Sequence, residues 1–176
     1  KKGDVLILAG SIPASLPDSI YSDIMERLEE KEVMIVVDAT KDLLVNVLKY
    51  HPFLIKPNNH ELGDIFGVEI RERDQVGPYA KKLQEMGARN VLVSMAGKGA
   101  VLLAEDGSVY ESPAPKGKLI NAVGAGDSMV AGFTAGYMQK GSYEHAFKMG
   151  VSTGSASAFS ENFATKEEVE AIYKTL

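Results

Sequence analysis

The chain has 176 residues, of which 45% are hydrophobic and 24% are charged, as is usual for one sizeable globular domain. A net charge of −5 disfavours sequence-independent binding to nucleic acid phosphates. The sequence contains no cysteine, which excludes disulfide scaffolds, thiolate metal sites and cysteine nucleophiles and fits a cytoplasmic protein. No apolar run approaches the ~18 residues of a membrane span. We therefore expect a single cytoplasmic domain over residues 1–176, with no nucleic acid or membrane partner.

Buried strands and amphipathic helices alternate along the first part of the chain. The predicted strands cover residues 5–10, 33–39 and 53–57. The predicted helices cover residues 16–31, 41–50, 58–66 and 77–87. Residues 90–112 predict strands joined by tight turns, and the chain from Val123 on is predicted to be helical in three segments around Gly141 and Glu161. This order is typical of right-handed βαβ crossovers, so we expect a three-layer αβα fold with a mainly parallel sheet.

Glycines and polar residues follow the predicted strands. Ligands of such sheets bind beyond the carboxyl ends of the strands, so these residues are the first candidates for a site. They are Gly10, Ser11, Asp38, Lys56, Asn58 and residues 94–99.

The stretch NAVGAGDSMVAGF (121–133) places a small-residue loop directly before a predicted helix. Gly124, Ala125 and Gly126 allow a tight turn that brings backbone N–H groups close to a ligand, and the helix start adds about half a positive charge. An anion such as a transferring phosphoryl group fits there, and Asp127 beside it can accept a proton from an attacking hydroxyl. The alternative is an acid that only stabilises a helix start, by about 0.3–1 kcal/mol.

The stretch KPNNHEL (56–62) is the second candidate. Lys56 can neutralise a nucleotide phosphate, while Asn58 and Glu61 lie three residues apart and suit a magnesium ion held largely through its waters. The alternative is that Asn58 caps the helix and Glu61 completes a capping box.

The stretch VSMAGKGA (93–100) is the third. A strand end followed by Ser94, Gly97 and Gly99 lets a nucleotide lie against bare backbone, but a tight hairpin needs the same residues, and by itself the pattern favours the turn.

Taken in this order, the three stretches resemble the PfkB, or ribokinase-like, carbohydrate kinases. NAVGAGDSMVAGF is similar to the second signature of that family, KPNNHEL to its Asn-x-x-Glu motif and SMAGKGA to its nucleotide-binding turn. AGSIPASLP (9–17) is similar to its Gly-Ser-Leu-Pro segment. Together with GSASAFS (154–160), the second signature is most similar to the bacterial 1-phosphofructokinase branch, with tagatose-6-phosphate kinases as near neighbours.

The resemblance implies a ribokinase-like fold, ATP and Mg²⁺ as cofactors, and a role for each residue. Asp127 would be the catalytic base, and the N–H groups of residues 124–126 would form the anion hole. Lys56 and Asn58 would contact the triphosphate, and Glu61 would help to place magnesium through water. The residues that would line the path of the nucleotide are Ser94, Gly97, Gly99 and Ser160.

The resemblance also implies a reaction, ATP-dependent phosphorylation of fructose 1-phosphate to fructose 1,6-bisphosphate, and a homodimer for the complete protein. Tagatose 6-phosphate is an alternative acceptor. Family members carry an N-terminal portion with a β-sheet lid and most of the sugar contacts, which this chain does not match. A truncated nucleotide-binding module without catalysis of its own is therefore a second interpretation, and from these residues alone we expect weak or no turnover. Two positions depart from the family pattern: Ala96 stands where the turn often has glycine, and Ala122 where the signature usually has Ser, Thr or Pro.

Overall fold

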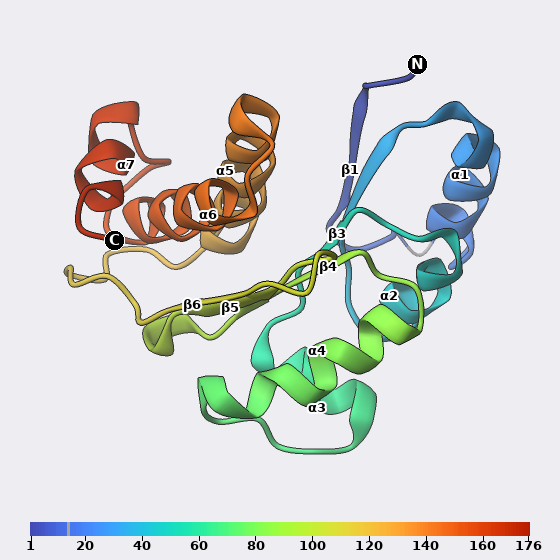
Figure 1. Ribbon diagram of the computed structural model, residues 1–176, viewed down its shortest axis with the longest axis horizontal. Coiled ribbons are helices and arrows are strands. Elements are labelled where there is room, and N and C mark those ends of the chain that lie inside the picture. The colour runs from blue at the N-terminus through green and yellow to red at the C-terminus, as the bar shows by residue number, and fades with distance from the viewer. Residues whose placement is uncertain (14) are drawn as a thin grey trace. The chain divides into compact units, whose positions relative to one another are not determined.

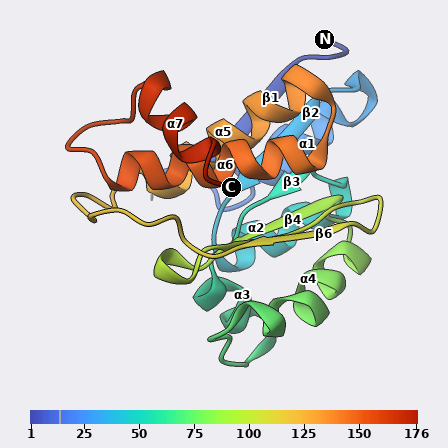
Figure 2. The same cartoon turned by 60° about the vertical axis from the view of Figure 1, so that its left-hand side comes forward.

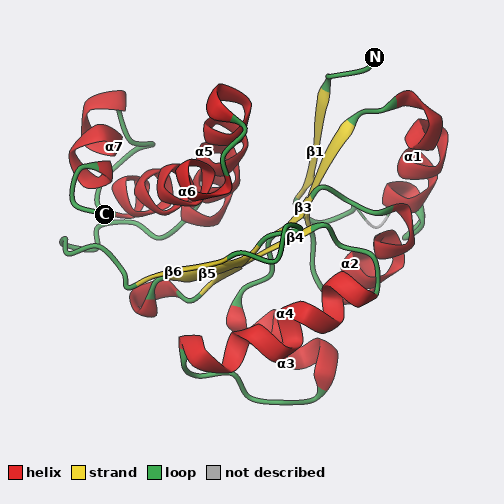
Figure 3. Ribbon diagram, viewed as in Figure 1, coloured by secondary structure: helices red, strands yellow, loops and turns green. Residues whose placement is uncertain are grey.

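The computed structural model describes residues 1–13 and 15–176; Ala14, within the segment 9–17 noted above, lies outside the described residues. The strands are β1 (Val5–Ala9), β2 (Met34–Asp38), β3 (Leu54–Ile55), β4 (Asn90–Ser94), β5 (Ala100–Leu103) and β6 (Val109–Ser112). The α-helices are α1 (Ile20–Leu28), α2 (Lys41–Val47), α3 (Asn59–Phe66), α4 (Val76–Glu85), α5 (Ala125–Lys140), α6 (Tyr143–Ala158) and α7 (Lys166–Tyr173). Short 3₁₀ turns lie at Glu29–Lys31, Leu48–Tyr50, Arg73–Gln75 and Ala96–Lys98. Figure 3 shows how these helices and strands follow one another.

The chain forms two compact units. Unit 1 comprises Lys1–Val93 and Leu102–Val109, and unit 2 comprises Ser94–Val101 and Tyr110–Leu176. The strands form one sheet in the order β1-β2-β3-β4-β5-β6. The first three pairings are parallel, and the short connections on either side of β5 require antiparallel neighbours. The expected α/β class with a mainly parallel sheet is therefore confirmed, whereas the single domain over 1–176 stays a prediction.

Unit 1 follows from the alternation of buried strands and amphipathic helices. Because β1 to β4 are neighbours in chain order and such crossovers are right-handed, the connecting helices lie on the same face of the strands. Figures 1 and 2 show α1, α2 and α4 side by side along that face. The core beneath them is made of fully buried aliphatic side chains. Among them are Val36, Leu44, Leu54, Leu62, Leu83 and Leu92.

Several elements are shorter than the sequence predicts. The helix expected over 16–31 is α-helical only at Ile20–Leu28, and the one expected over 41–50 only at Lys41–Val47. Both end in a 3₁₀ turn that is followed by a residue with left-handed backbone, Glu32 or His51. After α2 the apolar pattern continues through the tightened turn at Leu48, so it overstates the α-helical length. The turn after α1, Glu29–Lys31, is entirely charged.

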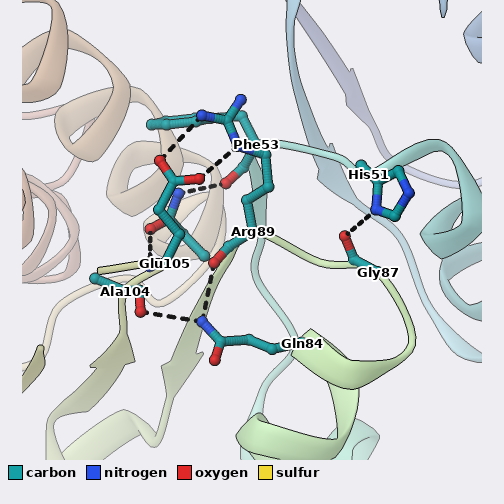
Figure 4. A network of polar contacts seen from close by, with 8 residues as sticks. His51, Phe53, Gln84, Gly87, Arg89, Ala104 and Glu105 are labelled. Carbon is teal, nitrogen blue, oxygen red and sulfur yellow. Dashed lines mark hydrogen bonds and ion pairs between the residues drawn. The ribbon is translucent and has the colours of Figure 1, made fainter. Parts of the chain in front are cut away.

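A polar network closes unit 1 at the amino-terminal end of β4 (Figure 4). The Arg89 guanidinium donates to both carboxylate oxygens of Glu105, at 2.6 and 3.0 Å. The Gln84 amide donates to the carbonyls of Arg89 and Ala104, at 2.9 and 3.0 Å. This network joins α4, β4 and the turn after β5. Since ligands of parallel sheets bind at the opposite ends of the strands, we assign it to stability.

Unit 2 is built on two antiparallel helices that pack closely through glycine. A side chain at Gly132 would collide with Thr153, and one at Gly136 would lie 2.9 Å from the Cβ atom of Met149. Near the other end, a Cβ atom at Gly154 would lie 3.0 Å from the carbonyl oxygen of Ala125. The start of α5 therefore lies beside the end of α6. The three helical segments expected after Val123 are confirmed.

Candidate functional site

The sequence-predicted site residues fall into two groups, one in each unit. Unit 1 carries Lys56, Asn58 and Glu61. Unit 2 carries Ser94, Gly97, Gly99, Gly124, Ala125, Gly126, Asp127 and Ser160.

The start of α5 is open. Gly124 is its N-cap residue, with φ +78°, and no side chain within the described part of the chain caps the helix. The first helical bond runs from the Ser128 N–H to the Gly124 carbonyl, at 2.8 Å. The N–H groups of Gly126 and Asp127 therefore precede the helical ladder and point along the helix axis. Asp127 lies in this first turn and is exposed. Backbone donors at a positive helix end suit an anion.

Two contacts fix the loop before α5 against the end of α6. The N–H groups of Ile120 and Asn121 both donate to the carbonyl of Ala158, at 2.9 and 3.1 Å. A side chain at Gly124 would come within 2.9 Å of the Phe163 ring, so the left-handed turn and the ring both require glycine there.

Ser160 lies at this same end of unit 2, just beyond α6. Its hydroxyl donates to the Ala156 carbonyl at 2.9 Å and lies 3.3 Å from the Glu168 carboxylate of α7. The hydroxyl thus joins two helices, and its expected place near the nucleotide stays a prediction.

The start of α3 is closed by a complete capping box. The Asn58 side-chain oxygen accepts from the N–H groups of His60 and Glu61, both at 2.9 Å. In return, Oε2 of Glu61 accepts from the Asn58 N–H at 2.8 Å. The capping box, which was one of the two interpretations of KPNNHEL, is therefore present. It uses only Oε2 of Glu61, so the capping box does not occupy Oε1.

Lys56 follows β3 and is buried, with 6% of its surface exposed. Its ammonium forms an ion pair with Asp38 at the end of β2, with Nζ 3.3 Å from Oδ1. Tyr21 of α1 reaches the same strand ends, since its hydroxyl lies 2.8 Å from the Ala9 carbonyl and 3.1 Å from the Gly10 carbonyl. Burial, and then the Asp38 carboxylate, raise the pKa of Tyr21 above its usual value.

The turn at residues 94–99 closes on itself. The Met95 N–H donates to the Gly99 carbonyl at 2.8 Å, and the Gly99 N–H donates to the Ala96 carbonyl at 3.0 Å. A side chain at Gly99, where φ is +96°, would collide with the Ser112 carbonyl, whereas Gly97 faces open space. Ala96 adopts φ +48° although it is not glycine. Gly99 is thus required by the hairpin, and only Gly97 offers open backbone.

No group of three or more His, Asp or Glu side chains among the described residues is arranged to hold a metal ion. Within residues 1–13 and 15–176 no helix is both long and apolar enough to span a membrane.

Sequence reasoning did not identify the partner of Lys56. Asp38 was among the candidate strand-end residues, but its ion pair with Lys56 depends on β2 and β3 being neighbours in the sheet. The predicted order of strand, helix and strand could have indicated this pair, because consecutive parallel strands usually lie side by side. The Phe163 ring beside Gly124 had no local signal, since the two residues are distant in sequence.

Comparison with known proteins gives concordant results. The profile of the pfkB family of carbohydrate kinases matches residues 1–169. The chain is 48% identical over 170 residues to the 1-phosphofructokinase of Bacillus subtilis, covering 97% of this chain and 56% of that protein. It is 31% identical over 169 residues to the D-tagatose-1-phosphate kinase of Bacillus licheniformis, covering 96% of this chain and 55% of that protein. The chain thus spans about half the length of the curated relatives it matches.

A solved structure matches along the whole chain. The phosphofructokinase-2 of Escherichia coli, in complex with substrates and products, superimposes with a TM-score of 0.92 at 26% identity, covering 100% of this chain and 58% of that one. The ribokinase-like fold expected from the sequence is therefore confirmed.

Proposed function

This chain belongs to the pfkB family of carbohydrate kinases, and on that premise we propose that the whole protein transfers the γ-phosphoryl group of ATP to a sugar phosphate. The acceptor we propose is fructose 1-phosphate, with fructose 1,6-bisphosphate and ADP as products. The observation that carries the proposal is the open start of α5, where the N–H groups of Gly126 and Asp127 precede the helical ladder and a carboxylate lies in the same turn.

In this proposal Asp127 is the catalytic base. Its carboxylate accepts the proton of the acceptor hydroxyl, whose oxygen attacks the γ-phosphorus while the bond from that phosphorus to the β,γ-bridging oxygen of ATP breaks. The exposed position of Asp127 in the first turn of α5 suits this role, because an acceptor can reach it. The proton leaves the hydroxyl as negative charge moves onto the ADP oxygen.

The N–H groups at the start of α5 form the anion hole. Gly124 turns the chain, and the N–H groups of Gly126 and Asp127 lie at the positive end of a 16-residue helix. The Ala125 N–H, expected in the anion hole, instead donates to the Ala122 carbonyl at 3.2 Å. Charge that develops on the γ-phosphoryl oxygens is stabilised there without rearrangement of the site.

Lys56, Asn58 and Glu61 serve the rest of the triphosphate. Lys56 supplies a fixed positive charge, and the Asn58 side-chain amide remains a donor while its oxygen caps α3. Glu61 has one carboxylate oxygen in the capping box and one left for a magnesium-bound water. Magnesium, when bound, supplies the charge that neutralises the β- and γ-phosphates. Ser94, Gly97 and Gly99 would then lie along the nucleotide, with Ser160 near the base.

The identity of the acceptor rests on the named relatives. The two curated relatives are named for fructose 1-phosphate and tagatose 1-phosphate kinases, so a ketohexose 1-phosphate is favoured over tagatose 6-phosphate. Steady-state assays of the complete protein with all three acceptors test this choice. We expect the highest kcat/KM with fructose 1-phosphate; a higher value with either tagatose phosphate would replace it.

We further propose that the complete protein is a cytoplasmic homodimer. The second candidate function is a nucleotide-binding module without catalysis of its own.

The first experiment is thermal unfolding with and without Mg-ATP. A nucleotide at ~100 times its dissociation constant stabilises a folded binder by about 2.7 kcal/mol. We expect a cooperative transition that moves upward with Mg-ATP and moves little with magnesium alone. A cooperative transition unaffected by Mg-ATP would contradict nucleotide binding. A shift with no turnover of any sugar phosphate would favour the binding module.

A further inference from the structure

The burial of Lys56 is unusual for a residue expected to meet a ligand. Lysine is rarely buried unless it is paired, and only 8% of this side chain is accessible. Its partner Asp38 is nearly as enclosed, with 16% of the side chain accessible. Exchange of such a pair for apolar side chains is often neutral or stabilising, so stability alone is a weak reason to keep it.

The sheet register holds the two charges together. Val37 of β2 is opposite Ile55 of β3, and the next residues in the two parallel strands are Asp38 and Lys56. The Lys56 N–H also donates to the Val37 carbonyl at 3.3 Å, which fixes the backbone from which the lysine side chain starts. Neither side chain therefore depends on a loop for its position.

The third strand end completes the arrangement. Ala9 of β1 is opposite Asp38, and the Gly10 N–H donates to the Asp38 carbonyl at 3.3 Å. The Tyr21 hydroxyl holds the carbonyls of Ala9 and Gly10 from the α1 side. The titratable groups that the structure places at this edge are thus Asp38, Lys56 and Tyr21, and the only cation of the three is Lys56.

We propose that Asp38 is a positioning residue, which holds the Lys56 ammonium in place by their ion pair and aims it at the polyphosphate of the nucleotide. The proposal rests on the proposed function, because it takes that polyphosphate as the ligand of Lys56. Asp38 holds the ammonium from a fixed position at the end of β2. An ammonium has three hydrogens, so one that is paired with a carboxylate can also donate to phosphate oxygens.

The test is a double-mutant cycle with Asp38→Asn, Lys56→Gln and the two combined, read as Mg-ATP affinity by calorimetry. Asp38→Asn should weaken binding about tenfold, since a hydrogen bond to a charged group is lost from an ordered position. Lys56→Gln should bind weakly, and Asp38→Asn should add nothing to it.

The double variant controls for misfolding, because it removes both buried charges and leaves neither of them unpaired. Asp38→Glu is the conservative variant and should restore most of the affinity. Asp42→Asn is the matched control, an exposed acid in the first turn of α2, and should not change the affinity for Mg-ATP.

A second measurement separates this proposal from the proposed function. In protein labelled with ¹⁵N at lysine Nζ, the wild type should show a protected Lys56 ammonium signal without nucleotide, identified by its loss in Lys56→Gln and also lost in Asp38→Asn. If the wild type binds no Mg-ATP, the proposed function fails, and the positioning role fails with it even though the ion pair is seen. If the wild type binds Mg-ATP and Asp38→Asn binds it equally well, Asp38 is only structural and the positioning role alone is overturned.

Discussion

The starts of α3 and α5 both follow a loop at which the sequence predicts phosphate binding, yet they differ in how their first N–H groups are used. At α3 the Asn58 side chain takes two of those N–H groups and Glu61 returns a bond to the Asn58 backbone. At α5 the N-cap is Gly124, which has no side chain to offer. The first helix start satisfies itself, whereas the second leaves its donors for a ligand.

This difference divides the expected chemistry. A self-capped helix start can place side chains, such as Asn58 and Glu61, but its amides at His60 and Glu61 are already paired. An open start can bind an anion through its backbone. We therefore expect substitutions at α5 to affect transfer of the phosphoryl group, and those at α3 to affect nucleotide affinity or stability.

The largest effect is expected at Asp127. In the complete enzyme Asp127→Asn should lower kcat by orders of magnitude while Mg-ATP affinity stays close to wild type, because the amide keeps the size of the side chain but cannot accept the proton. Steady-state kinetics and calorimetry check this. The matched control is Glu144→Gln, an acid in the first turn of α6, a helix capped by Ser142. Equal turnover in the Asp127 variant would remove this residue from the proposed role.

The next effect is expected at Gly124. Gly124→Ala should reduce stability by about 1–2 kcal/mol, since alanine disfavours the left-handed backbone, and it also meets the Phe163 ring. Thermal stabilisation by Mg-ATP should be largely lost.

Gly141→Ala is the control for Gly124→Ala. Gly141 ends α5 with φ +61° and faces open space. Gly141→Ala should lower stability by a similar amount, because alanine disfavours the same left-handed backbone. It should leave the thermal stabilisation by Mg-ATP unchanged. If both variants keep that shift, the start of α5 is not the anion site.

A smaller effect is expected at α3. Asn58→Asp should change stability by less than about 0.5 kcal/mol, because aspartate caps a helix as well as asparagine does. It should weaken Mg-ATP binding, since it places a negative charge near the triphosphate and removes the amide donor. Thr165→Asp, at the capping box of α7, is the control and should not change affinity. Unchanged binding in Asn58→Asp would make Asn58 a cap and nothing more.

The smallest effect concerns a third helix start, that of α6. Burial, and then Lys140, lower the pKa of His145 below its usual value of 6.5. The imidazole lies between the Tyr173 hydroxyl at 2.8 Å and the Gln139 side-chain oxygen at 3.2 Å. Because the folded state favours neutral imidazole, this contribution to stability is present above pH 6.5 and is lost as pH falls through the lowered pKa.

The loss should be small, because the imidazole is only partly buried. Denaturant unfolding between pH 7 and pH 5 measures it. His145→Gln should remove this part of the pH dependence, and a slope unchanged from wild type would contradict the assignment.

Much of the fold follows from the sequence alone. The buried strands, the amphipathic helices and the three C-terminal helices were predicted because apolar spacing reports local structure directly. The loop before α5, with Asp127 in the first turn, was predicted for the same reason. Glycine allows a tight turn and an acid stabilises a helix start, and both effects depend only on neighbouring residues. The capping box at Asn58 and Glu61 was likewise visible as one of two alternatives.

Tertiary structure decided the rest. The Asp38 partner of Lys56, the Phe163 ring beside Gly124 and the collision that a side chain at Gly99 would make with Ser112 all join residues that are distant in sequence. The structure also showed that α1 and α2 both end in a 3₁₀ turn, which apolar spacing does not distinguish from an α-helical one. The sequence determined which residues could carry the chemistry, since that is a matter of residue type and local backbone. Only the register of the sheet and the packing of the helices determined which of them are buried, paired or open.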